Sequence, residues 1–158
     1  MHIMTVCLGN ICRSPAAEAV LNDKIDKAGL TGLTVSSAGT AGYHIGEPPH
    51  VLTQDVGTER GYEFTTTATQ LNPELVASAD LILTMDGMNV ADIHALADTD
   101  RVVRLGTLAR RQPGDIDDPY GQGRDAFEHM YDVIEDACDH LVALLAEDRI
   151  DEIWEGAE

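Results

Sequence analysis

Short segments that are apolar on both faces alternate along this chain with segments of helical periodicity. Residues 2–8 (HIMTVCL) and 81–85 (LILTM) are almost wholly apolar, and residues 33–40 and 101–105 are two further candidate strands. Strands buried on both faces are typical of parallel sheets, whose crossover connections place helices on each face. We therefore expect a single three-layer α/β domain with a four-stranded parallel sheet flanked by helices on both faces.

Five helices are expected between and after these strands, at 15–28, 48–61, 72–80, 88–98 and 124–145. Ser14 is a favourable N-cap for the first, with Pro15 at the first helical position, while Gly57 disfavours the second. The last helix is the clearest, because its apolar residues recur at intervals of three and four. The acidic segment 147–158 is expected to fray as a tail, which leaves residues 1–146 as the domain.

Charge and cysteine content exclude several classes of protein. The 158 residues include 28 acidic and 10 basic ones, for a net charge of −18. Such a surface repels nucleic acids and anionic membranes, so neither is an expected partner. Three cysteines do not form a disulfide framework, and the chain lacks the pattern of a signal peptide or a transmembrane segment. We expect a monomeric cytoplasmic protein with reduced thiols.

The segment CLGNICRS, residues 7–14, follows the first strand and precedes the first helix. A turn through Gly9 and Asn10 allows successive backbone N–H groups to point into one concavity, beside the positive end of the helix dipole. Arg13 adds a planar fork that fits two phosphate oxygens. In this setting the pKa of Cys7 should fall below about 8.5, and Ser14 can donate to the sulfur. The loop is therefore expected to hold a phosphate under a thiolate nucleophile.

These residues also resemble a known family. The pattern C-x5-R-S is the signature of cysteine-dependent protein tyrosine phosphatases, and VCLGNICRSP closely resembles the low-molecular-weight members. The resemblance extends over about residues 3–145, through SSAGT, GEPP, ATQL and DPYG. It implies a phosphocysteine mechanism without metal or cofactor, in which Cys7 is the nucleophile, Arg13 binds phosphate, and Asp118, directly before a proline, is the general acid and base. It further implies a phosphate- and substrate-binding set that comprises Leu8, Gly9, Asn10, Ile11, Cys12, Ser14, Tyr43 and Tyr120.

The residues of the loop suggest two further features, and the resemblance adds the groups that support Asn10. Asn10 is expected in a left-handed conformation, with its side chain held by Ser14 and Ser37. The family also carries a histidine in this network, and Thr66 stands there in this chain. Cys12 either packs behind the loop or forms a reversible disulfide with Cys7 under oxidation.

The substrate is expected to be a phosphotyrosine-containing protein or a small aryl phosphate. Tyr43 and Tyr120 can stack on the ring, and Ile11 gives the pocket an apolar lining. One alternative is a protein-arginine phosphatase, although those relatives carry threonine at Ile11. Another is a phosphoprotein-binding module without turnover. An arsenate reductase is disfavoured because Cys138, the only later cysteine, lies in the apolar stripe of the last helix. A metal site at Asp115, Asp117 and Asp118 is disfavoured because no histidine or cysteine joins them.

Overall fold

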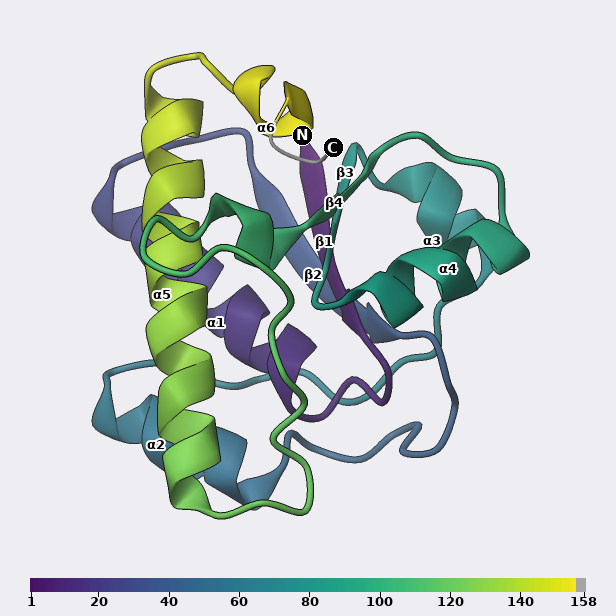
Figure 1. The fold of residues 1–158 in the computed structure, drawn as a ribbon, viewed down its shortest axis with the longest axis vertical. Coiled ribbons are helices and arrows are strands. Elements are labelled where there is room, and N and C mark those ends of the chain that lie inside the picture. The colour runs from purple at the N-terminus through teal and green to yellow at the C-terminus, as the bar shows by residue number, and fades with distance from the viewer. Residues whose placement is uncertain (156–158) are drawn as a thin grey trace.

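A computed structural model, which describes residues 1–155, contains the expected α/β domain (Figure 1). Its sheet has four parallel strands: β1 (His2–Cys7), β2 (Thr34–Gly39), β3 (Leu81–Thr84) and β4 (Val102–Arg104). The spatial order is β2-β1-β3-β4. Since the chain leaves β1 for one neighbour and later returns to the other, the order reverses beside β1. In open parallel sheets a ligand site lies beyond the carboxyl ends of the strands at this point.

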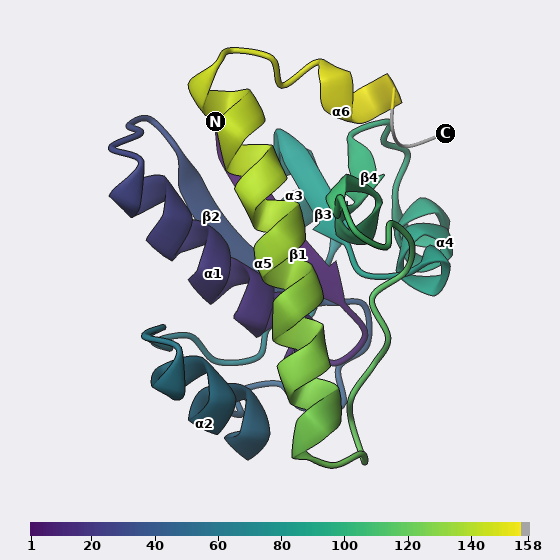
Figure 2. The same cartoon turned by 60° about the vertical axis from the view of Figure 1, so that its left-hand side comes forward.

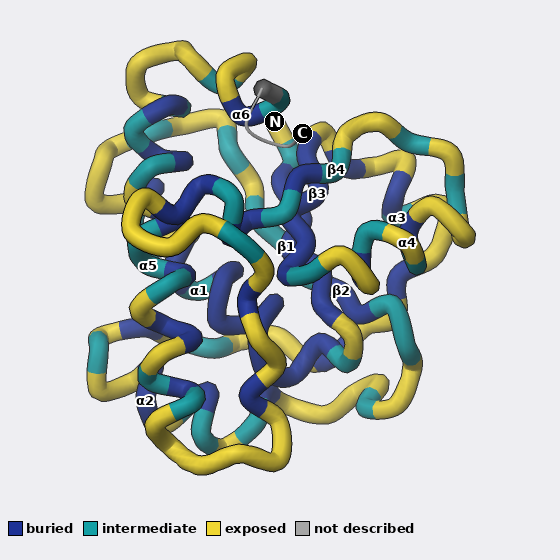
Figure 3. Tube along the Cα trace, in the orientation of Figure 1, coloured by how far each residue is buried: buried dark blue, intermediate teal, exposed yellow. Residues whose placement is uncertain are grey.

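Alternate residues of the central strands face two separate hydrophobic cores. Ile3 and Leu83 belong to the larger core, under α1 (Arg13–Lys27), α2 (Val51–Glu59) and α5 (Arg124–Ala146). Met4 and Ile82 belong to the smaller core, under α3 (Pro73–Ser78) and α4 (Gly87–Leu96). Figure 2 shows α1 and α5 side by side on one face of the sheet. The expected arrangement of helices on both faces is therefore confirmed, and Figure 3 shows the central strands buried between them.

The second helix forms despite Gly57 in its interior, with both neighbouring prolines outside it. A Cβ atom at Gly57 would lie 2.4 Å from the hydroxyl oxygen of Tyr131 and 2.4 Å from Cζ of Phe64. Tyr131 also donates from this hydroxyl to the carbonyl of Thr53 in the same helix, at 2.6 Å. Gly57 thus disfavours the helix locally, but its lack of a side chain allows α2 to approach α5.

The expectation that the acidic C-terminal segment frays is wrong for its described part. The chain turns back after α5 and ends in α6 (Glu152–Glu155), where Ile153 is fully buried in the larger core. Ile150 and Trp154 also pack against this core, so a few apolar residues anchor a segment whose overall composition is acidic. The remaining tail residues, 156–158, lie outside the described part of the chain. None of the described helices has the length and apolar character needed to span a bilayer.

Candidate active site

The loop between β1 and α1 has the form expected of an anion site. Cys7 ends β1, Arg13 begins α1, and both are buried. Asn10 adopts a φ of 57°, which confirms its left-handed conformation. Among the described residues, the backbone N–H groups of residues 9–12 donate to no acceptor. These amides are therefore free to bind an anion in the concavity of the loop.

A hydrogen-bond network behind the loop holds this conformation. The side-chain nitrogen of Asn10 donates to the hydroxyls of Ser14 at 2.7 Å and Ser37 at 3.0 Å. Its side-chain oxygen accepts from the backbone N–H of Thr69 at 2.9 Å. Both serine contacts predicted from the sequence are thus present. Ser37 in turn donates to Oε1 of Glu18 at 2.6 Å.

Ser14 contacts the sulfur of Cys7 and does not cap the helix. Its hydroxyl lies 3.1 Å from Sγ of Cys7. The expectation that it is the N-cap is wrong, because α1 begins at Arg13, two residues before the expected start, and its N-cap, Cys12, makes no side-chain capping bond. The hydroxyl is instead used inside the loop, where it accepts from Asn10 and is positioned to donate to a thiolate.

Arg13 is fixed by partners on two other segments. One terminal nitrogen, Nη1, donates to Oδ2 of Asp86 at 2.6 Å and to the carbonyl of Ile116 at 2.9 Å. The other, Nη2, lies 3.8 Å from Oδ2 of Asp118, and the buried Nε has no partner among the described residues. Burial lowers the pKa of Arg13, but the hydrogen bond with Asp86 and the charges of Cys7 and Asp118 outweigh it and raise the pKa. The guanidinium therefore stays charged, with its Nε–Nη2 edge free for an anion.

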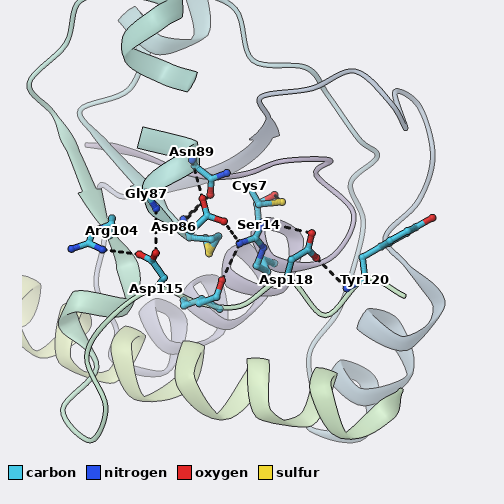
Figure 4. Close-up of polar contacts among 12 residues, drawn as sticks. Cys7, Ser14, Asp86, Gly87, Asn89, Arg104, Asp115, Asp118 and Tyr120 are labelled. Atoms are coloured by element: carbon cyan, nitrogen blue, oxygen red, sulfur yellow. Dashed lines mark hydrogen bonds and ion pairs between the residues drawn. The ribbon is translucent and has the colours of Figure 1, made fainter. Parts of the chain in front are cut away.

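The acidic segment after η1 (Leu105–Leu108) sends its carboxylates in different directions, as Figure 4 shows. Asp118 lies beside the loop and accepts from the backbone N–H of Tyr120 at 3.1 Å. Asp115 instead pairs with Arg104 at 2.7 Å, on the far side of Asp86. Within residues 1–155, no group of three or more histidine, cysteine or acidic side chains is arranged to hold a metal ion.

The predicted nucleophile, arginine and acid line one pocket of about 240 Å³. Leu8, Gly9, Ile11 and Cys12 line it from the loop, and the exposed Tyr43 and Tyr120 form its rim. Asn10, Ser14 and Ser37 stand behind the loop. A larger groove of about 620 Å³ lies between α1 and residues 61–66, but no cysteine or arginine lines it. The smaller pocket is therefore the candidate active site.

All three cysteines are buried. Burial raises the pKa of Cys12 to about 12, and the negative charges of Asp118 and Cys7 add to the effect. Burial within α5 likewise raises the pKa of Cys138 to about 12. Both groups are therefore protonated thiols at neutral pH, and all three cysteines are unpaired in the structure. Cys7 is the thiol that combines a hydroxyl donor with a position in the pocket.

Sequence reasoning missed four residues of the site. Asp86 orients Arg13, and Glu18 closes the network behind the loop. His44 lines the pocket with its ring centroid 6.0 Å from that of Tyr120, and His50 lies 5.8 Å from the same ring. The one available signal was the position of Asp86 directly after an apolar strand, at the edge of the sheet where Cys7 also lies.

Comparison with known proteins identifies close relatives over nearly the whole chain. A family model described as low molecular weight phosphotyrosine protein phosphatase matches residues 2–151. A Synechocystis protein, slr0328, is 41% identical over 156 residues, which cover 95% of this chain and 99% of that one. The crystal structure of a protein tyrosine phosphatase from Entamoeba histolytica, with Hepes in its active site, matches with a TM-score of 0.90 at 32% identity, covering 94% and 99% of the two chains. A Drosophila arginine phosphatase matches with a TM-score of 0.85 at 27% identity, covering 92% and 98%.

Proposed function

Because the chain belongs to the low molecular weight phosphotyrosine protein phosphatase family, we propose that it hydrolyses phosphotyrosine and related aryl phosphate monoesters through a phosphocysteine intermediate on Cys7. The observation that carries this proposal is the shared pocket of Cys7, Arg13 and Asp118. A thiolate, a charged guanidinium and a carboxyl group at one phosphate-sized concavity supply every group that this reaction requires.

In the first step, the Cys7 sulfur attacks phosphorus in line with the aryl oxygen. A sulfur–phosphorus bond forms and the phosphorus–oxygen bond breaks, while Asp118 gives its proton to the leaving oxygen. The free edge of Arg13 and the amides of residues 9–12 bind the phosphoryl oxygens. These donors are preorganised, because Asp86 and the carbonyl of Ile116 fix the guanidinium before substrate binds.

In the second step, water attacks the phosphorus of phosphocysteine. Asp118, now a carboxylate, accepts a proton from the water, and the sulfur leaves as a thiolate. Ser14 stabilises this thiolate by donating from its hydroxyl, which lies 3.1 Å from the sulfur. The products are inorganic phosphate and the original enzyme. Neither step needs a metal ion, since Arg13 and the loop amides neutralise the phosphoryl charge.

The pocket walls favour an aryl substrate. Tyr43 and Tyr120 stand exposed at the rim, and Leu8 and Ile11 add apolar surface between the rim and the sulfur. Aromatic side chains gain most from a planar ring placed at stacking distance. A phosphotyrosine-containing protein or a small aryl phosphate therefore fits this pocket better than an aliphatic phosphate.

Two alternatives differ from this proposal in substrate or in turnover. Similarity to the Drosophila arginine phosphatase favours phosphoarginine as a second candidate substrate, but the apolar Ile11 lines the pocket and offers no hydroxyl. A phosphoprotein-binding module would have no use for a proton donor, whereas Asp118 lies 3.8 Å from Arg13 in the same pocket. Hydrolysis of aryl phosphates thus explains the presence of both Ile11 and Asp118 in the pocket, which neither alternative does.

We also propose the setting in which the enzyme works. Its proposed catalytic residues all lie in residues 7–118, within the proposed catalytic domain 1–146, and Ile153 of the acidic segment packs into the core of that domain. The three free cysteines are consistent with a reducing cytoplasm. We further propose that the enzyme is a monomer.

Hydrolysis of p-nitrophenyl phosphate by the wild type and by Cys7→Ser tests the reaction. We expect turnover that resists a chelator, that vanadate inhibits, and that Cys7→Ser lacks while it remains folded. Trapping of a phosphorylated enzyme during turnover should require Cys7. Absence of turnover by the folded, reduced wild type, or turnover retained by Cys7→Ser, would overturn the proposal.

A further inference from the structure

A buried carboxyl group stands at the far end of the network that reaches the catalytic sulfur. Glu18 lies on α1 with only 8% of its surface exposed, yet it has no ion-pair partner among residues 1–155. Its Oε1 accepts from Ser37 at 2.6 Å and from Thr66 at 3.5 Å. Burying a carboxyl group without an ion-pair partner lowers the stability of the fold. We therefore ask what Glu18 does in this position.

In this network, the contacts of Asn10 determine which groups donate and which accept. The side-chain oxygen of Asn10 accepts from the backbone of Thr69, which fixes its amide nitrogen toward Ser14 and Ser37. Both serine oxygens therefore accept from Asn10, and the single hydroxyl hydrogen of each must point elsewhere.

Each serine hydrogen then has a defined acceptor. That of Ser37 points to Glu18. That of Ser14 points either to the sulfur of Cys7, 3.1 Å away, or to the carbonyl of Ala38 at 3.5 Å. The shorter contact favours the sulfur, provided that Asn10 keeps Ser14 in place. Four hydrogen bonds thus connect Glu18 to Cys7 through Ser37, Asn10 and Ser14.

We propose that Glu18 is a positioning residue, whose carboxyl oxygen fixes the direction of this hydrogen-bond chain so that Ser14 donates to the sulfur of Cys7. This role rests on the proposed function of Cys7 as the nucleophile. Without an acceptor at Glu18, the hydroxyl of Ser37 is free to rotate, and the amide nitrogen of Asn10 loses one of the two acceptors that hold it in place. Ser14 then turns toward Ala38, and the thiolate loses a charge-assisted hydrogen bond.

Thr66 lies beside Glu18 and gives it a second, longer hydroxyl contact. A histidine there, as in the resemblance described above, can carry a positive charge next to the carboxylate. Thr66 is neutral, and its hydroxyl contact of 3.5 Å is longer than that of Ser37. The acceptor oxygen of Glu18 therefore holds the network mainly through Ser37.

Titration of the Cys7 thiol in three variants tests the proposal. The pH dependence of inactivation by iodoacetate and the ultraviolet absorbance of the thiolate both report it without substrate. Glu18→Leu removes the acceptor and should raise the pKa of Cys7 by about one unit, since it forfeits a hydrogen bond to an ionised group. Glu18→Gln keeps an acceptor oxygen without the charge, and should restore a pKa close to that of the wild type.

Ser37→Ala breaks the next link and should raise the pKa as Glu18→Leu does. The double variant Glu18→Leu/Ser37→Ala should add little, because the two changes interrupt one chain. Asp26→Asn is the matched control: it removes an exposed carboxylate from the same helix and the same groove. It should leave both the pKa of Cys7 and kcat/KM unchanged.

The sign of the shift separates the possible roles of Glu18. If Glu18 acts only by charge repulsion, its removal lowers the pKa of Cys7, in Glu18→Leu and Glu18→Gln alike. If it acts only in folding, the free energy of unfolding changes and the pKa of Cys7 does not. Either result in folded variants would overturn the proposal. Because the titration needs no turnover, it also distinguishes this failure from failure of the proposed phosphatase activity.

Discussion

The Nη1 atom of Arg13 donates to Oδ2 of Asp86 at 2.6 Å, across the carboxyl ends of β1 and β3. The side chain of Arg13 is 3% exposed and that of Asp86 is 23% exposed, so the pair is largely shielded from water. Oδ1 of Asp86 accepts from the backbone N–H of Asn89 and caps α4. One carboxylate therefore joins the orientation of Arg13, the proposed phosphate-binding residue, to the start of a helix on the opposite face of the sheet.

Asp86→Asn should weaken phosphate binding more than it weakens the fold. The asparagine oxygen can still cap α4, but its amide group cannot accept from Arg13 in place of Oδ2. We expect kcat/KM for p-nitrophenyl phosphate to fall about tenfold or more, because Arg13 loses a charge-assisted anchor. Thermal unfolding serves as the control. A variant with unchanged kcat/KM would show that Ile116 alone is sufficient to hold the guanidinium.

Substitution of Asp118 and of its neighbour Asp117 tests the proposed general-acid role of Asp118. Asp118→Asn should lower kcat about a hundredfold to ten-thousandfold, with a smaller loss for aryl phosphates whose leaving group is more acidic. Asp117→Asn is the matched control, since Asp117 is exposed in the same segment and does not line the pocket of Cys7. Steady-state kinetics on a series of substituted phenyl phosphates would measure both. A greater loss in Asp117→Asn would reverse the assignment.

Local sequence predicts the parts of the site that lie close together in the chain, whereas Asp118, Tyr43, Tyr120 and Ser37 were assigned to the site only through the family resemblance. Cys7, Asn10 and Arg13 fall within one turn between a strand and a helix, so local geometry and a single motif determine their arrangement. Asp86 and Glu18 were missed for a different reason. Asp86 reads as an ordinary helix cap, and Glu18 as a polar position on a surface helix; their contacts depend on how distant segments pack.

Two local expectations failed because tertiary contacts outweigh local preference. Ser14 is a favourable N-cap by type, yet its hydroxyl is directed to Cys7 and Asn10. The acidic segment after α5 reads as disordered by composition, yet Ile153 anchors it in the core. The periodicity of the sequence predicts that a helix or strand exists. The residue at which it begins or ends depends on the hydrogen bonds that its polar groups form with distant segments.

Gly57→Ala should destabilise the protein even though alanine favours helices. The new methyl group would meet Phe64 and the hydroxyl of Tyr131 at 2.4 Å, and α2 would have to move away from α5. We expect the free energy of unfolding to fall by about 1–3 kcal/mol, as for other overpacked sites. Denaturant unfolding would measure this, with the exposed Thr58→Ala in the same helix as the control. Equal stability of the two variants would contradict the close approach.

The stability of the protein should depend on pH through Glu18. Burial raises the pKa of Glu18 above its ordinary value, although hydrogen bonds from Ser37 and Thr66 oppose the shift. A carboxyl group with a raised folded pKa contributes stability below its unfolded pKa of about 4.3 and loses that contribution as the pH rises through the folded value. Glu18→Gln should therefore gain stability relative to the wild type as the pH rises from acid to neutral. Denaturant unfolding of both proteins across this range would measure the difference, and a constant difference would contradict the raised pKa.

Ile11→Thr should shift the preference of the enzyme between two phosphate classes. Ile11 lines the pocket beside Cys7 and presents apolar surface to the leaving group. Threonine removes part of that surface and adds a hydroxyl that can orient a polar guanidinium or a water molecule. We expect kcat/KM to fall for phosphotyrosine peptides and to rise for phosphoarginine peptides of the same sequence. Wild-type enzyme that prefers phosphoarginine would contradict the aryl assignment, whereas equal losses on both substrates in the variant would mean that Ile11 supports the loop without selecting the substrate.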